Sequence, residues 1–209
     1  MAIVISPASL RDLSAKNNRE SMLSTEDFYN IGLWIGDKYV WGNSVGLTNT
    51  SKELIEEFKK FLSRNNPGKR IKEISIDGKA KRVYVNSSKF LRFLQKVQEN
   101  IINLIETEEQ FVSYISGKID ADGTIMPYNV KFRTGFIKIT YGKRSEAEKD
   151  LFLLRKFGLD GCILPYKKRN AVDLKFTFNS CLKLLEKLKL KHPKKKKRLV
   201  ILTKRLVGR

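Results

Sequence analysis

Two carboxylates follow an apolar, helix-like run in the stretch YISGKIDADGTI, residues 114–125. Asp120 and Asp122 stand where this helix is expected to end, just before Gly123. The C-terminal end of a helix carries partial negative charge, which repels an acidic side chain by about 0.3–1 kcal/mol. A positive group should therefore lie near these carboxylates, and a divalent cation is the obvious candidate. An ordinary surface-exposed helix end is the alternative.

Two common metal- or phosphate-binding motifs do not fit this part of the chain. A calcium loop of the EF-hand type that begins at Asp120 needs glycine at its sixth position and glutamate at its twelfth, where Ile125 and Lys131 stand. A P-loop ending at residues 142–144 fails because arginine replaces the required serine or threonine. The single histidine and the two cysteines are isolated, so any metal chemistry must depend on carboxylates.

The composition indicates a folded protein that binds a polyanion. The 209 residues include 42 lysines and arginines against 22 acids, a formal net charge of +20, and 41% of them are hydrophobic. Nucleic acid is the leading partner, because heat adaptation or solubility usually mixes charges of both signs. No long apolar run and no signal-peptide pattern occurs, so we expect no membrane association and a cytoplasmic location, or an organellar matrix in a eukaryote.

The pattern of apolar residues and turn signals predicts the same order of elements twice. Asp77-Gly78 predicts a tight hairpin in the first copy. Asp37 and Asp122 are 85 residues apart (122 − 37), and Asn86 and Asn179, which both precede an apolar helical run, are 93 apart (179 − 86). We therefore predict an α+β fold with a pseudo-twofold repeat of α-β-β-α-β-β-α units. It has two antiparallel four-stranded sheets, with helices packed on one face.

The repeat divides the chain into four predicted segments. Residues 1–24 form an N-terminal arm, residues 25–107 the first half-domain and residues 108–190 the second half-domain. Residues 191–209 form a basic C-terminal tail, which we expect to be flexible and to bind phosphate or aid solubility.

The two copies align at the segments NIGLWIGDK (30–38) and ISGKIDADG (115–123). Small residues recur four positions apart in both of them, namely Gly32, Gly36, Gly117 and Ala121. Such spacing lets two helices approach backbone to backbone. If these helices pack together, Asp37 and Asp122 meet at their C-terminal ends, and two carboxylates under a basic sheet would bind Mg²⁺.

The segment ISGKIDADG resembles the LAGLIDADG signature of homing endonucleases, and NIGLWIGDK is similar to a degenerate first copy of it. The likeness covers roughly residues 26–190 and corresponds to the single-chain, two-motif branch of the family. The resemblance implies a saddle of two sheets in the DNA major groove. It also implies an intron- or intein-encoded monomer that cuts both strands of a long, asymmetric duplex site, using Mg²⁺ or another divalent cation such as Mn²⁺.

The resemblance also implies roles for particular residues. Asp37 and Asp122 would be the catalytic metal ligands, with the backbone of Gly36 and Ala121 as further candidate ligands. Lys38 replaces the final glycine of the first copy, beside Asp37.

The family also places a polar helper residue and a lysine at each half-site. Asn49 fits the polar role in the first half, whereas its counterpart by alignment is Tyr141, a poor match. Lys81 and Lys138 are the candidate lysines. Lys118 departs from the family pattern, in which an apolar residue is usual.

Side-chain alternation along the predicted strands places a set of polar residues on the sheet face opposite the helices. These candidate DNA-binding residues are Arg82, Tyr84, Lys131, Arg133, Lys138 and Lys175. Arginine and lysine suit guanine edges and phosphates, although each residue alone could belong to an ordinary solvated strand face.

Two alternatives to the nuclease remain open. An RNA-binding maturase that helps an intron fold would use the same basic surface. A catalytically inactive DNA-binding protein of the same fold is the other alternative, and Lys38 favours it. Retention of both acids favours the nuclease, because a protein that only binds nucleic acid has no need of them.

Overall fold

The computed structural model describes residues 23–129, 134–165 and 170–207, and its elements follow the predicted order. The first copy of the repeat contains α2 (Thr25–Asp37), β1 (Lys38–Trp41), β2 (Ser44–Asn49), α3 (Lys52–Asn65), β3 (Lys72–Ile76), β4 (Ala80–Asn86) and α4 (Ser88–Leu104). The second copy contains α5 (Glu108–Asp122), β5 (Gly123–Asn129), β6 (Thr134–Tyr141), α6 (Arg144–Lys156), β7 (Gly161–Pro165), β8 (Val172–Phe176) and α7 (Phe178–Leu185). A further helix, α8 (Pro193–Val207), follows the second copy.

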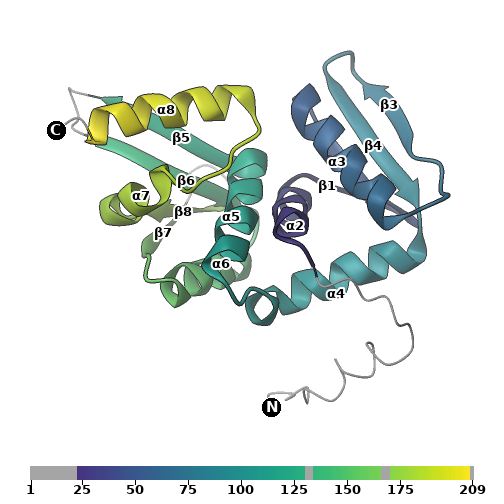
Figure 1. Ribbon diagram of the computed structural model, residues 1–209, viewed down its shortest axis with the longest axis horizontal. Coiled ribbons are helices and arrows are strands. Elements are labelled where there is room, and N and C mark those ends of the chain that lie inside the picture. Colours follow the sequence, from purple (N-terminus) through teal and green to yellow (C-terminus); the bar gives the residue numbers. More distant parts are fainter. Residues whose placement is uncertain (1–22, 130–133, 166–169, 208–209) are drawn as a thin grey trace.

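Each copy forms one antiparallel four-stranded sheet (Figure 1). The strand order is β1-β2-β4-β3 in the first sheet and β5-β6-β8-β7 in the second, so the two sheets have the same topology. The central helices α2 and α5 lie between the two sheets, as Figure 1 shows. The predicted α+β fold with its pseudo-twofold repeat is confirmed.

Alternation along the strands gives each sheet an apolar inner face. Leu47 on β2 pairs with Val83 on β4, and both are fully buried against the helices. In the second sheet Ile139 on β6 pairs with Leu174 on β8 in the same way. The residues between them point to the outer face, because successive side chains of a strand alternate in direction.

The turn between β3 and β4 forms as its sequence predicts. Asp77 has φ 50° and Gly78 has φ 66°. Two consecutive residues with positive φ are the requirement of a tight type I′ hairpin, and Asp-Gly is among the pairs that tolerate it best. The predicted hairpin is confirmed.

The start of α7 differs from the prediction. Its N-cap is Thr177, whose hydroxyl accepts a hydrogen bond from the backbone N–H of Ser180. The N-caps of α4 and α7, Ser87 and Thr177, are therefore 90 residues apart (177 − 87), not the 93 inferred from the two asparagines. Several neighbouring residues of this segment have side chains able to cap a helix, so sequence alone could not fix the choice.

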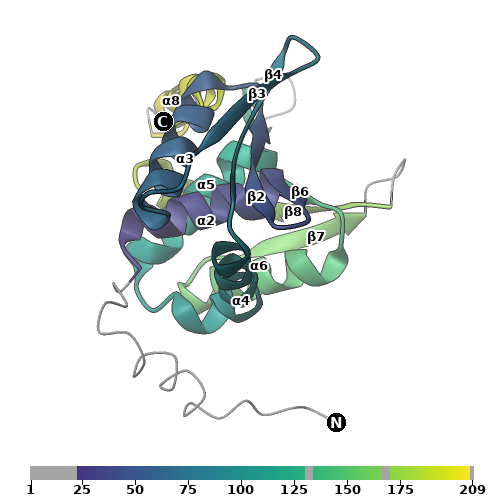
Figure 2. The ribbon, with the colours of Figure 1, turned by 90° about the vertical axis from the view of Figure 1, so that its right-hand side faces the viewer.

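Glycines let the central helices α2 and α5 touch backbone to backbone (Figure 2). A Cβ atom on Gly32 would lie 2.1 Å from the carbonyl oxygen of Tyr114. A Cβ atom on Gly117 would lie 2.0 Å from the carbonyl oxygen of Tyr29. Both distances are too short for non-bonded atoms, so a larger residue at either position would force the helices apart.

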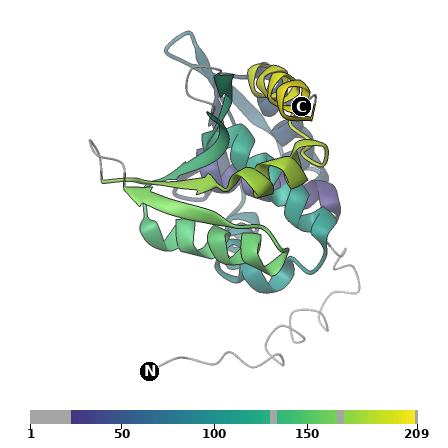
Figure 3. The same cartoon turned by 90° about the vertical axis from the view of Figure 1, so that its left-hand side faces the viewer.

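The prediction of a flexible C-terminal tail is wrong, because residues 193–207 form the helix α8. Leu199, Leu202 and Leu206 are buried, and their spacing of three and four residues puts them on one helical face. This face packs against β5 and α7 (Figures 1 and 3). The run of lysines at 194–197 obscures the amphipathic pattern that follows it.

Within the described ranges, none of the helices combines the length and apolarity needed to cross a bilayer. The predicted N-terminal arm lies, up to residue 22, outside the described residues. The boundaries of the two half-domains stay a prediction.

Candidate metal site and nucleic-acid interface

The two acids singled out by the sequence meet at the ends of the central helices. Asp37 is the last residue of α2 and Asp122 the last residue of α5. A Cβ atom on Gly36 would lie 2.3 Å from the Cβ of Ala121 and 3.2 Å from Oδ2 of Asp122. The carboxylate of Asp122 therefore lies against the end of α2. The seam of small residues thus continues to the point where the two acids stand.

Burial perturbs the ionisation of both acids, and the charge of Asp122 adds to the effect on Asp37. Burial, together with the charge of Asp122, raises the pKa of Asp37 to about 6, against the smaller opposing effects of Asn49 and Lys195. Burial also raises the pKa of Asp122, and the charges of Lys118 and Lys195 oppose this rise. Two carboxylates that resist ionisation when close together gain from a shared cation, because the cation cancels their repulsion.

The donor set suits a hard divalent cation. Carboxylate and carbonyl oxygens are the ligands that Mg²⁺ prefers in proteins. Across the described ranges, no group of three or more His, Cys, Asp or Glu side chains is arranged to hold a metal. A cation at this site would therefore be held by Asp37 and Asp122, with backbone carbonyls of the helix ends and water completing its shell.

Asn49 holds Asp37 in place from the end of β2. Its side-chain N–H donates to Oδ2 of Asp37 at 2.6 Å, and its own Oδ1 accepts from the backbone N–H of Ser51 at 2.7 Å. The second half has a different arrangement. Tyr141 stands at the end of β6, but its hydroxyl donates to Asp150 on α6 at 2.6 Å. The polar helper predicted from the sequence thus contacts a candidate metal ligand in the first half only.

Lys118, which departs from the family pattern, belongs to the same buried cluster. Its side chain is 3% exposed, and its Nζ lies 3.7 Å from Oδ2 of Asp150. Its ammonium also stands over the ring of Tyr141, and the hydroxyl of Tyr114 donates to Asp150 at 2.9 Å. The buried charges of Lys118 and Asp150 thus pair with each other, because an unpaired charge would be costly to bury.

The positive group expected near the end of α5 is a lysine that sequence reasoning missed. Lys195 on α8 donates from Nζ to the carbonyl oxygens of Ile119, Asp120 and Ala121, each at 2.8 Å. These carbonyls lie at the negative end of the helix dipole, where a cation is favoured. The spacing of apolar residues at 199, 202 and 206 could have signalled the helix, but no local pattern shows where it docks.

Asp120, the first acid of the opening stretch, is a buried anchor. Its Oδ2 accepts from the hydroxyl of Tyr29 at 2.7 Å and from the backbone N–H groups of Lys191 and His192 at 2.6 and 3.2 Å. The first copy has Ile35 at the equivalent place. Asp120 thus binds the segment leading into α8 to both central helices.

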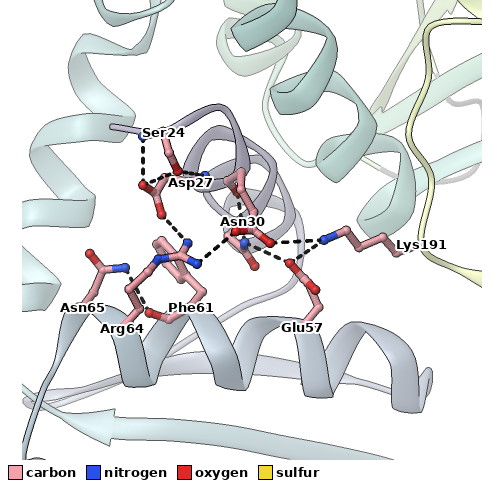
Figure 4. A network of polar contacts seen from close by, with 9 residues as sticks. Ser24, Asp27, Asn30, Glu57, Phe61, Arg64, Asn65 and Lys191 are labelled. Carbon is pink, nitrogen blue, oxygen red and sulfur yellow. Dashed lines mark hydrogen bonds and ion pairs between the residues drawn. The ribbon is translucent and has the colours of Figure 1, made fainter. Parts of the chain in front are cut away.

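A polar network extends this anchor into the first half (Figure 4). Lys191 forms an ion pair with Glu57 on α3, and Glu57 also accepts a hydrogen bond from the side-chain amide of Asn30 at 3.4 Å. Arg64 on α3 in turn pairs with Asp27 on α2 at 2.6 Å. The segment after α7 is therefore fastened to both halves of the molecule.

The candidate lysines both lie in ion pairs of the sheets. Lys81 stands opposite Asn49 in the pairing of β2 with β4, and its Nζ is 2.6 Å from Oε1 of Glu73. The Nζ of Lys138 is 2.6 Å from Oδ2 of Asp173 on the outer face of the second sheet. Other lysines act on the candidate metal ligands. The charge of Lys195 lowers the pKa of both Asp37 and Asp122, and the charge of Lys118 lowers that of Asp122.

The outer face of the first sheet carries stacked aromatic and basic side chains. The guanidinium of Arg82 lies 3.9 Å above the ring of Tyr39, and its Nε donates to Oγ1 of Thr48 at 3.0 Å. Tyr84 meets Tyr39 edge to face with ring centres 5.5 Å apart. Trp41, which shares the face of Tyr39 by alternation, is 76% exposed and was not among the predicted residues.

On the second sheet the described part of the outer face is also basic. Lys175 stands over the ring of Phe136 at 4.7 Å, on the strand neighbouring Lys138. Lys131 and Arg133, the remaining candidates, lie outside the described residues. The predicted binding surface thus includes Arg82 and Tyr84 on one sheet and Lys138 and Lys175 on the other.

Comparison with known proteins finds a family model that matches part of the first half and solved structures that share the fold. A sequence model of the LAGLIDADG-like domain matches residues 30–98, which include the more degenerate first motif. The fold is similar to that of the homing endonuclease I-DmoI. Its mesophilic variants match with a TM-score of 0.62 at 19% identity, covering 79% of this chain and 96% of theirs. The structure of I-DmoI in complex with DNA and Ca matches with a TM-score of 0.62 at 18% identity, covering 80% of this chain and 91% of that one.

Two further likenesses concern other proteins. The N-terminal LAGLIDADG domain of DUF199/WhiA matches with a TM-score of 0.56 at 14% identity, covering 83% of this chain and 88% of that one. A component of the A-type ATP synthase of Methanopyrus kandleri is 26% identical over 151 residues, which are 72% of this chain. This chain spans only 14% of the length of that curated relative.

Proposed function

From the premise that the chain contains a LAGLIDADG-like domain and has the fold of the LAGLIDADG homing endonuclease I-DmoI, we infer that it is a site-specific, metal-dependent DNA endonuclease. Its substrate is a long, asymmetric duplex site, recognised by two similar but unequal sheets. Both motifs lie in one chain, so a monomer suffices. An intron or intein as the host of its reading frame is part of the same proposal.

The observation that carries the proposal is the meeting of Asp37 and Asp122 at the ends of two helices that touch along glycines. A protein that only binds nucleic acid has no need to hold two repelling carboxylates together. Burial raises the pKa of both groups, and the charge of Asp122 adds to the rise at Asp37, which costs stability when they ionise. Carboxyl groups with raised pKa values, held together by tightly packed helices, are typical of a functional site.

The chain's own residues would position the reacting groups. A divalent cation bound there supplies Lewis-acid stabilisation of the phosphate and lowers the pKa of an attacking water. Asp37 and Asp122 hold it, and the rigid helix seam fixes their separation. Asn49 orients Asp37 through its hydrogen bond. Arg82, Lys138 and Lys175 on the outer faces would hold the phosphates and base edges of the duplex.

A cleavage selection tests the proposal. The protein is incubated with a pooled duplex DNA library that includes intron-free candidate host genes, with Mg²⁺ or with EDTA. We expect double-strand cuts at one long site with Mg²⁺ only, abolished in Asp37→Asn and Asp122→Asn, while DNA affinity stays within a few-fold. Cutting by Asp122→Asn at the wild-type rate would refute the site assignment.

One observation supports a second candidate, a DNA-binding protein that does not cut. The ammonium of Lys195 lies at the end of α5, where it already supplies positive charge to the acids. Duplex binding without cutting, equal in Mg²⁺ and in EDTA, would favour this candidate. A preference for intron RNA over duplex DNA in the same assay would favour a maturase.

A further inference from the structure

Lys195 has the contacts of a bound cation rather than those of a surface lysine. Its ammonium has three N–H groups, and each carbonyl of Ile119, Asp120 and Ala121 lies 2.8 Å from Nζ. Burial lowers the pKa of Lys195, and the charges of Asp120, Asp37 and Asp122 oppose this change. The ammonium is thus saturated by the end of α5 and lies within electrostatic reach of both candidate metal ligands.

The rest of the C-terminal segment fixes the position of this ammonium. The backbone N–H groups of Lys191 and His192, just before α8, are held by the buried carboxylate of Asp120. Behind Lys195, Leu199 and Leu202 are buried on the packed face of α8. An ammonium fixed from both sides loses little further conformational freedom when it binds the carbonyls.

The end of α2 carries no equivalent contact from its neighbouring lysine. Lys38, which follows Asp37 directly, points toward α4 and lies 3.4 Å from the side-chain oxygen of Gln98. Its ammonium also lies 5.7 Å from the ring centre of Trp34. The ammonium at the shared end of the helices is therefore held by carbonyls of α5, and its charge reaches both Asp37 and Asp122.

We propose that Lys195 is a resident counter-ion of the two-carboxylate site, so that docking of α8 and binding of a divalent cation oppose each other. The Lys195 ammonium and the divalent cation are both attracted by the Ala121 carbonyl and by the charge of Asp122, and the two cations repel one another. The proposal rests on the metal site of the proposed function. It adds that the pair of Asp37 and Asp122 binds metal more weakly as long as Lys195 is docked.

Binding of Mn²⁺ to the DNA-free protein, measured by electron paramagnetic resonance at pH 8, tests this coupling. We expect Lys195→Met to tighten Mn²⁺ binding within the range of about 5- to 150-fold that is typical of coupled sites. Lys197→Met is the matched control, because Lys197 is exposed on the same helix and its loss removes the same charge. Its Mn²⁺ affinity should stay close to that of the wild type, since solvent and salt screen an exposed charge.

Two further measurements separate this role from a purely structural one. Lys195→Arg keeps the charge and should bind Mn²⁺ as weakly as the wild type does. In the wild type, saturating Mn²⁺ should speed hydrogen exchange of the amides in the first turns of α8, because coupling is reciprocal. This second measurement needs no variant and so does not depend on the folding of Lys195→Met.

The outcomes distinguish the coupling from the proposed function. If Lys195→Met binds Mn²⁺ no more tightly than the wild type, or if exchange in α8 slows on binding, the counter-ion role is refuted and the metal site stands. If Mn²⁺ binds neither the wild type nor Lys195→Met, the metal site fails and the coupling fails with it. Tighter binding by Lys195→Met that is lost again when Asp122→Asn is added supports both.

Discussion

The ends of the central helices α2 and α5 carry the same acid in different surroundings. Asp37 accepts a hydrogen bond from the amide of Asn49, whereas the carbonyls just before Asp122 bind the ammonium of Lys195, brought there by α8. Two residues before the acid, Ile35 occupies the place of the buried anchor Asp120. Two repeats can thus share a sheet topology and a helix seam, while the neighbours of each acid differ: Asn49 comes from the same copy, and Lys195 from the helix that follows the second copy.

The seam common to both halves should be the most sensitive to mutation. Gly117→Ala would put a methyl group 2.0 Å from the carbonyl oxygen of Tyr29, a backbone atom that cannot move aside. We expect a loss of about 3 kcal/mol or more in the free energy of unfolding, measured by urea denaturation. Gly142→Ala is the control, because a Cβ atom there meets nothing within 4 Å. Equal stability of the two variants would contradict the close packing of the helices.

The anchor found only in the second half should give the next largest effect. Asp120→Asn leaves one oxygen to accept the three hydrogen bonds that Oδ2 accepts, but it removes the charge that strengthens them and puts an N–H₂ group at the buried place of Oδ1, which has no hydrogen-bond partner. We expect a loss of about 2 kcal/mol in unfolding free energy and faster proteolysis after residue 188. Asp77→Asn, in an exposed turn that suits asparagine, should change stability by less than about 0.5 kcal/mol. Full protection of α8 in Asp120→Asn would show that the anchor is dispensable.

The polar helper of the first half should matter for cleavage, and its counterpart should not. Asn49→Ala removes the hydrogen bond that orients Asp37, and we expect cleavage of one strand to slow about tenfold, which corresponds to about 1.4 kcal/mol. Tyr141→Phe removes a bond to Asp150 and should leave both rates unchanged while lowering stability. Single-turnover assays with differently labelled strands measure each rate. If Asn49→Ala slowed the cleavage of both strands equally, the proposed difference between the two half-sites would be refuted.

The burial of Asp37, together with its repulsion by Asp122, should give the smallest effect, and one of opposite sign. The pKa of Asp37 is raised from 3.8 to about 6, so the folded state binds the proton more tightly and loses stability as pH rises between these values. Asp37→Asn should therefore stabilise the protein by about 1 kcal/mol above pH 6, after allowance for partial solvent screening. The gain should vanish at about pH 2.5, well below both pKa values, where the carboxyl is protonated in the folded and the unfolded state. Thermal melting at the two pH values checks this, and destabilisation at pH 7 would contradict the assignment.

Much of the fold was predictable because its signals are local. Alternation placed Arg82 and Lys175 on outer faces, and their neighbours Val83 and Leu174 are buried; Asp77-Gly78 marked a turn through its backbone preference. The start of α7 was predicted two residues late, because Thr177 and Asn179 can both cap a helix and only the packed chain selects between them. Local preference predicts that an element exists more reliably than it predicts where the element ends.

The candidate site was predictable in part. The repeat of small residues and acids located Asp37 and Asp122, because the spacing of glycines on a helix is itself a packing signal. The role of Asp120 as an anchor and the pairing of Lys118 with Asp150 were not predictable. Each depends on a partner more than 30 residues away, which no local pattern can identify.

The sequence by itself determined the doubled topology, the basic surface and the pair of acids at the helix ends. These follow from periodicity, charge and spacing, which act over a few residues of chain. Only the tertiary structure decided that a basic segment expected to be a flexible tail forms a helix and places Lys195 against the end of α5. The physical reason is that a buried cation is stable only where carbonyls and carboxylates from distant segments converge to replace its water.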